Sequence, residues 1–497
     1  MPETPQPAPS SDRRRRLLGA ALAWLVLSAG LLALYWFPQA KQLAGDEVSV
    51  YQPMALSVLA GGDWFDPRLL WPPLQGLFMA AVYALAGPHV LAVQLVQLAL
   101  LVLSGVLLQR CCLLLTGDTR TADWAAIALV VNPATIAFAT WLWPEIMHLF
   151  ASLLLAWLLL ARRGLTDARR ATAVAGLAGA ALGLCLLAKS LLAGFWPLLL
   201  VTLWQRRAPG RSLAALAAFG LGALLVTGPV VHRSWQETGR ATIADSSWFN
   251  LWVGLGDRWR SDYVFDETGE RMAEYLASAD DASGRAAYAR EQALGIVEAQ
   301  GVVATLARQA GRQYFRLFDA RTTLSAQLPG PACRGHIGLY SLRTPWLVSA
   351  VDHLARGWHL ALLLMAGLGL LAWRDWRRPW IWLLLVFLGY QLALFGGLHV
   401  KTRFLVPMLP VLCLFAAHLL VRLGESAATT HAATALRGLW PGWRAPVAAL
   451  AATALLVLSL AGPALDGACA DHVPQPAGTS LSVASGAFER PVGHAGD

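Results

Sequence analysis

Long apolar runs recur along almost the whole chain, and they constrain its fold more than any other feature. A helix that crosses a bilayer needs roughly 20 mostly apolar residues, and such stretches recur between Leu17 and Pro463. Only 14% of the residues are charged and 57% are hydrophobic, whereas about a quarter of the residues in a soluble chain are charged. We therefore expect an all-α integral membrane protein.

Most arginines stand in short clusters between the apolar runs, so the net charge of +9 indicates a topology and not a nucleic-acid partner. Short loops rich in Lys and Arg stay on the cytoplasmic side of a membrane. This rule predicts a multi-pass protein of the cell inner (plasma) membrane with about eleven crossings, its N-terminus cytoplasmic and its C-terminus outside. The predicted spans are 17–37, 90–109, 124–141, 146–161, 171–188, 190–204, 212–231, 357–373, 379–398, 404–421 and 445–463.

Two of these assignments depend on the charges. Residues 73–86 are apolar, but a crossing there would place Arg110 outside and invert every later cluster, so we expect a juxtamembrane helix at the outer interface. The span 190–204 is short, and the charges alone demand it. The first span follows Arg13 to Arg16 without a small-residue cleavage site, so we expect a retained anchor and not a signal peptide.

The predicted organisation has four parts. An N-terminal transmembrane module covers 1–231 and contains a first external loop at 38–89. An extracytoplasmic region covers 232–356, C-terminal transmembrane helices cover 357–463, and a disordered external tail covers 464–497. Apolar residues at helical spacing between Gly284 and Phe318 predict one or two amphipathic helices. Cys333 and Cys469, both external, are expected to form a disulfide or to remain separate thiols.

With this topology, acidic and basic residues meet on the outer face. Isolated charges at membrane edges are expensive to desolvate and are often functional. The acids are Asp46, Glu47, Asp63, Asp66 and Glu145, and the basic residues are Lys189, His399, Lys401 and Arg403.

Each of these groups also has a simpler explanation. Asp46 and Glu47 are explained as a solvated loop pair, and Glu145 as an acid in the first turn of a helix. Lys189 is explained by snorkelling to lipid headgroups, and Lys401 with Arg403 as a helix-end anchor. Their shared face favours a functional site. A cationic cradle stabilises a departing phosphate, and a nearby carboxylate accepts the proton of an attacking hydroxyl.

Several short motifs resemble the GT-C fold glycosyltransferases, especially the protein O-mannosyltransferase and lipid A aminoarabinose transferase group. They are spread from about residue 40 to 415. In order, they are Gly45-Asp46-Glu47, Gly61-Gly62-Asp63-Trp64, Trp71-Pro72-Pro73-Leu74, Ala188-Lys189-Ser190, Ser247 to Gly254, and Arg403 to Pro410.

The resemblance implies a GT-C fold and a catalytic carboxylate at Asp46. It also implies that Lys189 and Arg403 hold the phosphate of a polyprenyl-phosphate sugar donor and that Glu145 faces the same cavity. Glu47, His399 and Lys401 are further candidate substrate-binding residues. Some relatives carry Glu-Lys where this chain has Leu70-Trp71, so aminoarabinose specificity is not carried over.

The sequence therefore predicts a membrane glycosyltransferase whose active site faces the periplasm. Its partners would be a polyprenyl-phosphate sugar donor, membrane lipid, and a glycan, lipid or protein acceptor, with no nucleic acid. We expect no cofactor and no obligate metal, although a divalent metal remains open. The alternatives are a transporter or flippase for a lipid-linked sugar and a catalytically silent GT-C scaffold.

Overall fold

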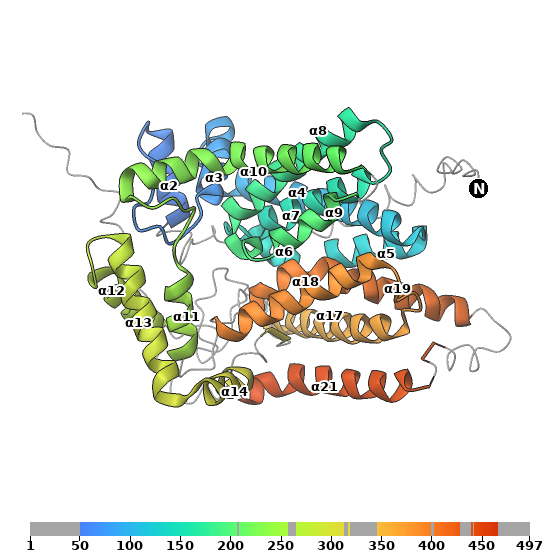
Figure 1. The fold of residues 1–497 in the computed structure, drawn as a ribbon. Helices are drawn as coiled ribbons and strands as arrows, with labels where there is room; N and C mark the ends of the chain where they lie inside the picture. Colours follow the sequence, from blue (N-terminus) through green and yellow to red (C-terminus); the bar gives the residue numbers. More distant parts are fainter. Residues whose placement is uncertain are drawn as a thin grey trace, which may run out of the picture.

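A computed structural model describes most of the chain between residues 50 and 465. The described ranges are 50–205, 208–256, 265–312, 317–318, 345–398, 402–427, 439–440 and 442–465. Within these ranges every regular element is a helix, so the predicted all-α architecture is confirmed. Figure 1 shows the helices up to α10 in one half of the molecule and those from α17 onward in the other.

The helices fall into three sets along the chain. The first contains α2 (Gln52–Leu59), α3 (Leu74–Ala86), α4 (Val90–Thr116), α5 (Thr119–Val130), α6 (Pro133–Thr140), α7 (Glu145–Arg162), α8 (Ala168–Ala188), the 3-10 helix η2 (Ser190–Leu192), α9 (Trp196–Leu203) and α10 (Pro209–Thr238). The second contains α11 (Ser247–Gly256), α12 (Phe265–Ala277), α13 (Ala282–Gln300) and α14 (Val302–Arg312). The third contains α17 (Pro345–Ala372), α18 (Pro379–Gly397), the 3-10 helix η4 (Thr402–Met408), α19 (Leu409–Ala427) and α21 (Arg444–Leu465).

Buried apolar clusters contain residues from the long helices of both halves. Neighbouring helices pack in the order α10, α8, α7, α4, α5, α19, α17 and α21. One apolar cluster joins α2 to α7 with α17 to α19, and a second joins α7 to α10 with residues of α18. The halves are therefore packed against each other by buried side chains.

Seven helices among the described residues are long and apolar enough to cross a membrane, so the chain is a multi-span membrane protein. They lie at 90–116, 145–162, 168–188, 209–238, 353–372, 379–396 and 403–426. α21 covers the predicted span 445–463. The predicted span 17–37 lies outside the described residues, as do Cys333 and Cys469.

The predicted span 124–141 is not one straight helix, because α5 and α6 meet at a bend of 48°. Pro133 follows Asn132, which is extended (ψ 122°) and accepts a hydrogen bond from the backbone N–H of Ala134 at 2.9 Å. A proline disfavours helical geometry in the residue before it, and the Asn side chain caps the new helix start.

The prediction of a helical span at 190–204 is wrong, because this segment forms only η2 and the eight-residue α9. At 1.5 Å per residue α9 is about 12 Å long, far less than the roughly 30 Å of a bilayer core. The chain nevertheless returns from one end of the bundle to the other here.

The return follows from the parallel packing of α8 and α10. Gly179 lies against Phe219 and Gly183 against Val226, so the two helices run in the same direction. A Cβ atom on Gly179 would lie 1.9 Å from the Phe219 carbonyl oxygen, so the contact requires glycine. Small residues allow such close backbone approach between membrane helices. Because both helices start at the same end, the segment between them must run the length of α8 backwards.

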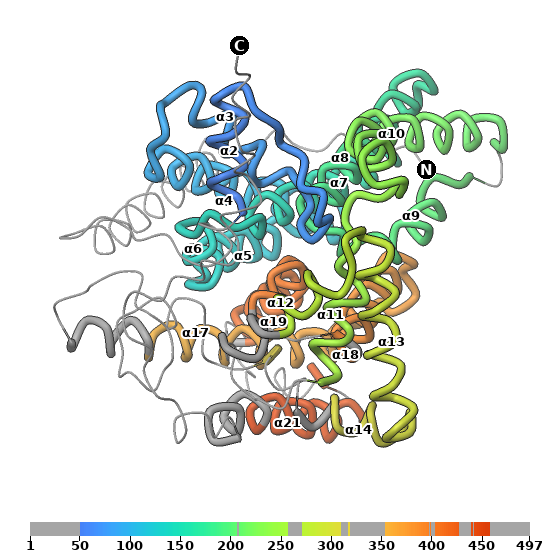
Figure 2. Tube along the Cα trace, turned by 90° about the vertical axis from the view of Figure 1, so that its left-hand side faces the viewer, coloured from blue at the N-terminus to red at the C-terminus, as the bar shows by residue number. Residues whose placement is uncertain are grey.

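The helices α11, α12 and α13 lie together at one end of the bundle (Figures 1 and 2). The region predicted to be helical between Gly284 and Phe318 contains α13 and α14, which meet at Gly301 (φ +80°). α14 is amphipathic as predicted, whereas the apolar residues of α13 are spread around the helix. A helix, α3, is present where the sequence predicts a juxtamembrane helix at residues 73–86, and its place at the membrane interface stays a prediction.

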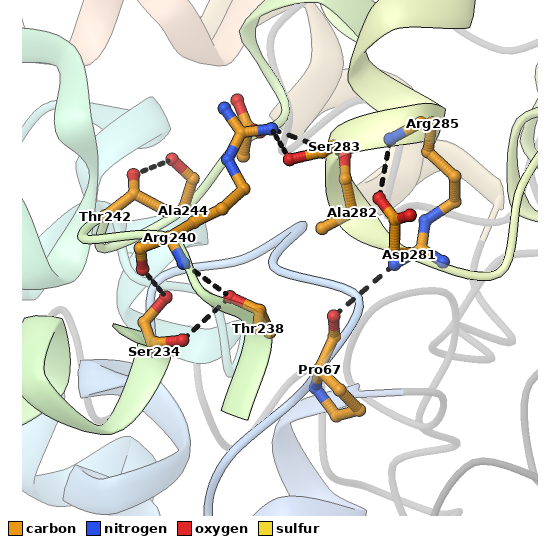
Figure 3. A network of polar contacts seen from close by, with 12 residues as sticks. Pro67, Ser234, Thr238, Arg240, Thr242, Ala244, Asp281, Ala282, Ser283 and Arg285 are labelled. Carbon is orange, nitrogen blue, oxygen red and sulfur yellow. Dashed lines mark hydrogen bonds and ion pairs between the residues drawn. The ribbon is translucent and has the colours of Figure 1, made fainter. Parts of the chain in front are cut away.

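The segment before α3 packs onto this end region, which the sequence did not predict. Phe65 and Leu69 cluster with Ala282, and the Leu69 carbonyl accepts the Asp245 backbone N–H at 2.6 Å. Figure 3 shows Arg285 reaching the Pro67 carbonyl (3.4 Å), while Arg240 contacts Ser283 (3.3 Å). The described parts of the two predicted external pieces are therefore packed against each other.

Candidate active site

Three of the predicted site residues meet in one charged cluster. The Lys189 Nζ atom donates to Glu145 Oε1 at 2.6 Å, and Arg403 Nε lies 3.8 Å from the same oxygen. The Glu145 side chain is 1% exposed, whereas the side chains of Lys189 and Arg403 are each 17% exposed. Glu145 thus anchors both cations from the protein interior, and each cation keeps a surface that a ligand can reach.

Each member of the cluster stands where a helix begins or ends. Glu145 is the first residue of α7 and follows Pro144, which suits an N-terminal position. Lys189 is extended (φ −154°, ψ 127°) and ends α8. Arg403 lies in η4, immediately before α19. Charges at helix ends reach the edge of a bundle without a charged group in the middle of a span.

Two aromatic rings contact Arg403 in addition to Glu145. The Arg403 Cζ atom lies 4.3 Å from the centre of the Trp143 ring and 5.7 Å from that of Phe404. Lys189 Nζ lies 5.6 Å from the Phe404 ring, which stacks on Phe395. A cation within about 6 Å of a ring centre is attracted to the ring face, so these rings fix the direction of the guanidinium.

His148 is a fourth polar residue beside the cluster, and sequence reasoning missed it. It lies three residues after Glu145 on α7 and is 1% exposed. Residues three apart share a helix face, so its spacing from Glu145 was the available indication. Trp143 and Phe404 were also not singled out, since aromatic residues are common in every span of this chain.

The remaining candidates cannot be placed beside the cluster. Asp46, Glu47, His399 and Lys401 lie outside the described residues, so their roles stay predictions. Among the described residues, no three His, Cys, Asp or Glu side chains are grouped so that they could hold a metal ion.

Asp63, in the Gly-Asp-Trp motif, has a partner of its own. Its Oδ2 atom pairs with Arg233 Nη2 at 2.6 Å, and the same arginine lies 2.9 Å from Glu237. Burial acts to raise the pKa of Asp63, but hydrogen bonds from the Phe65 backbone and from Arg233 outweigh it and hold the pKa below its ordinary value. Asp63 is therefore an ionised anchor between the segment before α3 and α10.

The Leu70-Trp71 pair, where some relatives carry two charged residues, is packed in an apolar cluster. Leu70 is 4% exposed and lies with Phe249, Trp252 and Tyr275 of the end region. A charged pair in this place would replace apolar side chains that pack in this cluster. The apolar pair thus fits the docking of the first external loop onto α11 to α13.

Comparisons with known proteins give similar structures but no sequence relative. No protein-family model matches the chain, and no curated protein sequence does. An archaeal oligosaccharyltransferase from Archaeoglobus fulgidus, in complex with an inhibitory peptide and a dolichol-phosphate, has 15% identity and a TM-score of 0.42. The match covers 94% of this chain and 57% of the archaeal one, so this chain spans little more than half of that protein's length.

Two further solved structures are similar. An oligosaccharyltransferase from the same archaeon, in complex with Zn and sulfate, has a TM-score of 0.47 at 15% identity, over 93% of this chain and 54% of that one. ArnT from Cupriavidus metallidurans in the apo state has a TM-score of 0.38 at 15% identity, over 82% of this chain and 79% of ArnT. With TM-scores below 0.5 these structures carry no argument of their own, and the functional conclusion rests on the site.

Proposed function

We propose that this protein is a membrane glycosyltransferase of the GT-C kind. It would move a sugar from a polyprenyl-phosphate carrier to an acceptor on the extracytoplasmic side of the inner membrane. The observation that carries the proposal is the pair of partly exposed cations, Lys189 and Arg403, held on one buried oxygen of Glu145. Two fixed cations at a membrane edge suit a phosphate that is attached to a lipid.

In this mechanism the acceptor hydroxyl attacks the anomeric carbon of the donor sugar. The bond between that carbon and the phosphate oxygen breaks, and its electron pair stays on the phosphate. Lys189 and Arg403 stabilise the charge that develops there. Asp46 accepts the proton of the acceptor hydroxyl. The sequence resemblance supports Asp46 in this role, and no metal takes part in the proposed step.

The test is the sugar content of cell-envelope glycans in cells that carry the wild-type protein, Asp46→Asn, or neither. We expect a sugar addition, detected by mass, that is present with the wild type and lost with Asp46→Asn. The matched control is Asp375→Asn, since Asp375 is an exposed acid that pairs with Arg378 near the start of α18. Undiminished addition with Asp46→Asn would remove the catalytic assignment.

A second experiment separates the transporter alternative. A flippase moves the lipid-linked sugar between leaflets and forms no new glycosidic bond. Purified protein in liposomes with donor lipid on one side would then translocate the donor without transfer to any acceptor. That result would refute the enzyme proposal as a whole.

A further inference from the structure

Three buried glutamines connect α3 and α4 to the turn that carries Glu145. Gln75, Gln94 and Gln97 are each 0% exposed. Gln97 Nε2 donates to the Ala139 carbonyl at 3.0 Å and to the Trp141 carbonyl at 2.5 Å, and Gln94 Nε2 donates to the Thr140 carbonyl at 2.7 Å. Three consecutive carbonyls at the end of α6 are thus bound by side chains of α4.

These hydrogen bonds satisfy backbone carbonyls that the end of α6 leaves without partners. The last carbonyls of a helix have no partner within the helix, and a bilayer core offers no water to satisfy them. α6 ends at Thr140, and α7 starts at Glu145. The glutamine amides supply donors where the helix break leaves acceptors, so the turn is tied to α4.

The orientation of the Gln97 amide is itself fixed. Its Oε1 atom accepts a hydrogen bond from Gln75 Nε2 of α3 at 3.1 Å. With the oxygen engaged on that side, the amide NH₂ group points to the Ala139 and Trp141 carbonyls. A line of contacts therefore runs from Gln75 through Gln97 to Trp141, and along the backbone to Trp143 and Glu145.

We propose that Gln97, oriented by Gln75, is a positioning residue for the Lys189 and Arg403 cations. It fixes the turn from Trp141 to Pro144, and this turn places both Glu145, which holds the two cations, and Trp143, which lies against Arg403 at 4.3 Å. The role in donor binding rests on the proposed function, whereas the effect on the geometry of Lys189 does not.

The test uses Gln97→Leu, and Gln391→Leu is the matched control. Gln391 is also 0% exposed, and its amide atoms have no hydrogen-bond partner among the described residues. Lysine reactivity is a direct readout, because the chain has only three lysines, Lys41, Lys189 and Lys401. Folded protein in detergent is treated with formaldehyde and a reductant, and methylation of each lysine is measured by mass spectrometry relative to Lys41.

In Gln97→Leu we expect methylation of Lys189 to become about tenfold faster, which corresponds to an ion pair with Glu145 weakened by about 1.4 kcal/mol. Gln391→Leu should leave it at the wild-type rate. In transfer assays the KM for the lipid-phosphate sugar should rise more than kcat falls. A purely structural role would lower the amount of folded protein without this change in Lys189.

Equal Lys189 reactivity in folded Gln97→Leu and Gln391→Leu would overturn the proposal. If Gln97→Leu does not fold, Gln75→Leu provides the test. This variant keeps the Gln97 side chain that binds the Ala139 and Trp141 carbonyls and removes only the hydrogen bond that orients its amide. We expect methylation of Lys189 in Gln75→Leu to be faster than in the wild type, though by less than in Gln97→Leu. An unchanged methylation rate would overturn the proposal. If the wild type transfers no sugar, the proposed function fails, and the Lys189 measurement still tests the positioning role.

Discussion

Replacement of Glu145 by Gln should show how strongly the two cations depend on one buried carboxylate. Removal of one partner from a buried ion pair costs roughly 3–5 kcal/mol of folding free energy. The two cations here keep 17% exposure, so water takes over part of the lost interaction. We therefore expect Glu145→Gln to lower the free energy of unfolding by about 3 kcal/mol.

The two pairs should contribute unequally, and a double-mutant cycle measures each contribution. Coulomb attraction falls with distance, and the distances to Glu145 Oε1 are 2.6 Å for Lys189 and 3.8 Å for Arg403. The coupling of Glu145 to Arg403 should thus be about two-thirds of its coupling to Lys189. The cycles combine Glu145→Gln with Lys189→Met or Arg403→Met.

The assay is reversible unfolding in mixed detergent micelles, followed by circular dichroism. We expect a coupling of about 2 kcal/mol for Lys189 and a smaller one for Arg403. A coupling near zero for Lys189 would show that the carboxylate does not hold the ammonium, and a larger value for Arg403 than for Lys189 would refute the argument from distance.

Three further predictions address other parts of the molecule. Gly222→Val should lower the free energy of unfolding by about 1–3 kcal/mol, because a Cβ atom at residue 222 would lie 2.0 Å from the Gly176 carbonyl oxygen. The control Gly220→Val should change the thermal stability little, because the space around its Cβ position is open. The pKa of Asp63 is lowered in the folded state, so its ionised form stabilises the fold at pH values above the ordinary pKa of 3.8. This stabilisation is lost as the pH falls through the pKa of the folded state. The thermal unfolding temperature of Asp63→Asn should therefore vary less with pH in the acidic range than that of the wild type. Sugar transfer by membranes washed with EDTA should equal transfer by untreated membranes, and restoration of lost activity by a divalent metal would contradict the proposal of a metal-free step.

The meeting of Glu145, Lys189 and Arg403 was predictable because topology alone places them. Each residue interrupts or ends an apolar run, and the arginine clusters assign all three to one side of the membrane. Their mutual pairing was not predictable, because side-chain distances depend on how α7, α8 and η4 pack. The sequence also gave no sign that Gln94 and Gln97 bind the end of α6, since an isolated glutamine in an apolar run has many possible partners.

The errors of the sequence interpretation have a physical cause as well. The span at 190–204 was assigned from the charge rule, which says that the chain crosses but not what structure it adopts. Gly194 and Pro197 stand inside this segment, and residues of these types weaken or break helices. The docking of the first external loop onto α11 to α13 joins residues far apart in the chain, and no local pattern encodes that pairing.

The burial of Glu145 also limits which acid can serve as the base. A general base must come within hydrogen-bond reach of the hydroxyl that it deprotonates. The Glu145 side chain is 1% exposed, and its Oε1 atom already accepts from Lys189 at 2.6 Å. Asp66 is 6% exposed and binds Arg68, and Asp63 is held by Arg233. Burial closes Glu145 and Asp66 to an acceptor, whereas the Asp63 side chain is 44% exposed but engaged by Arg233. Asp46 is the acid that the sequence motif indicates as the base.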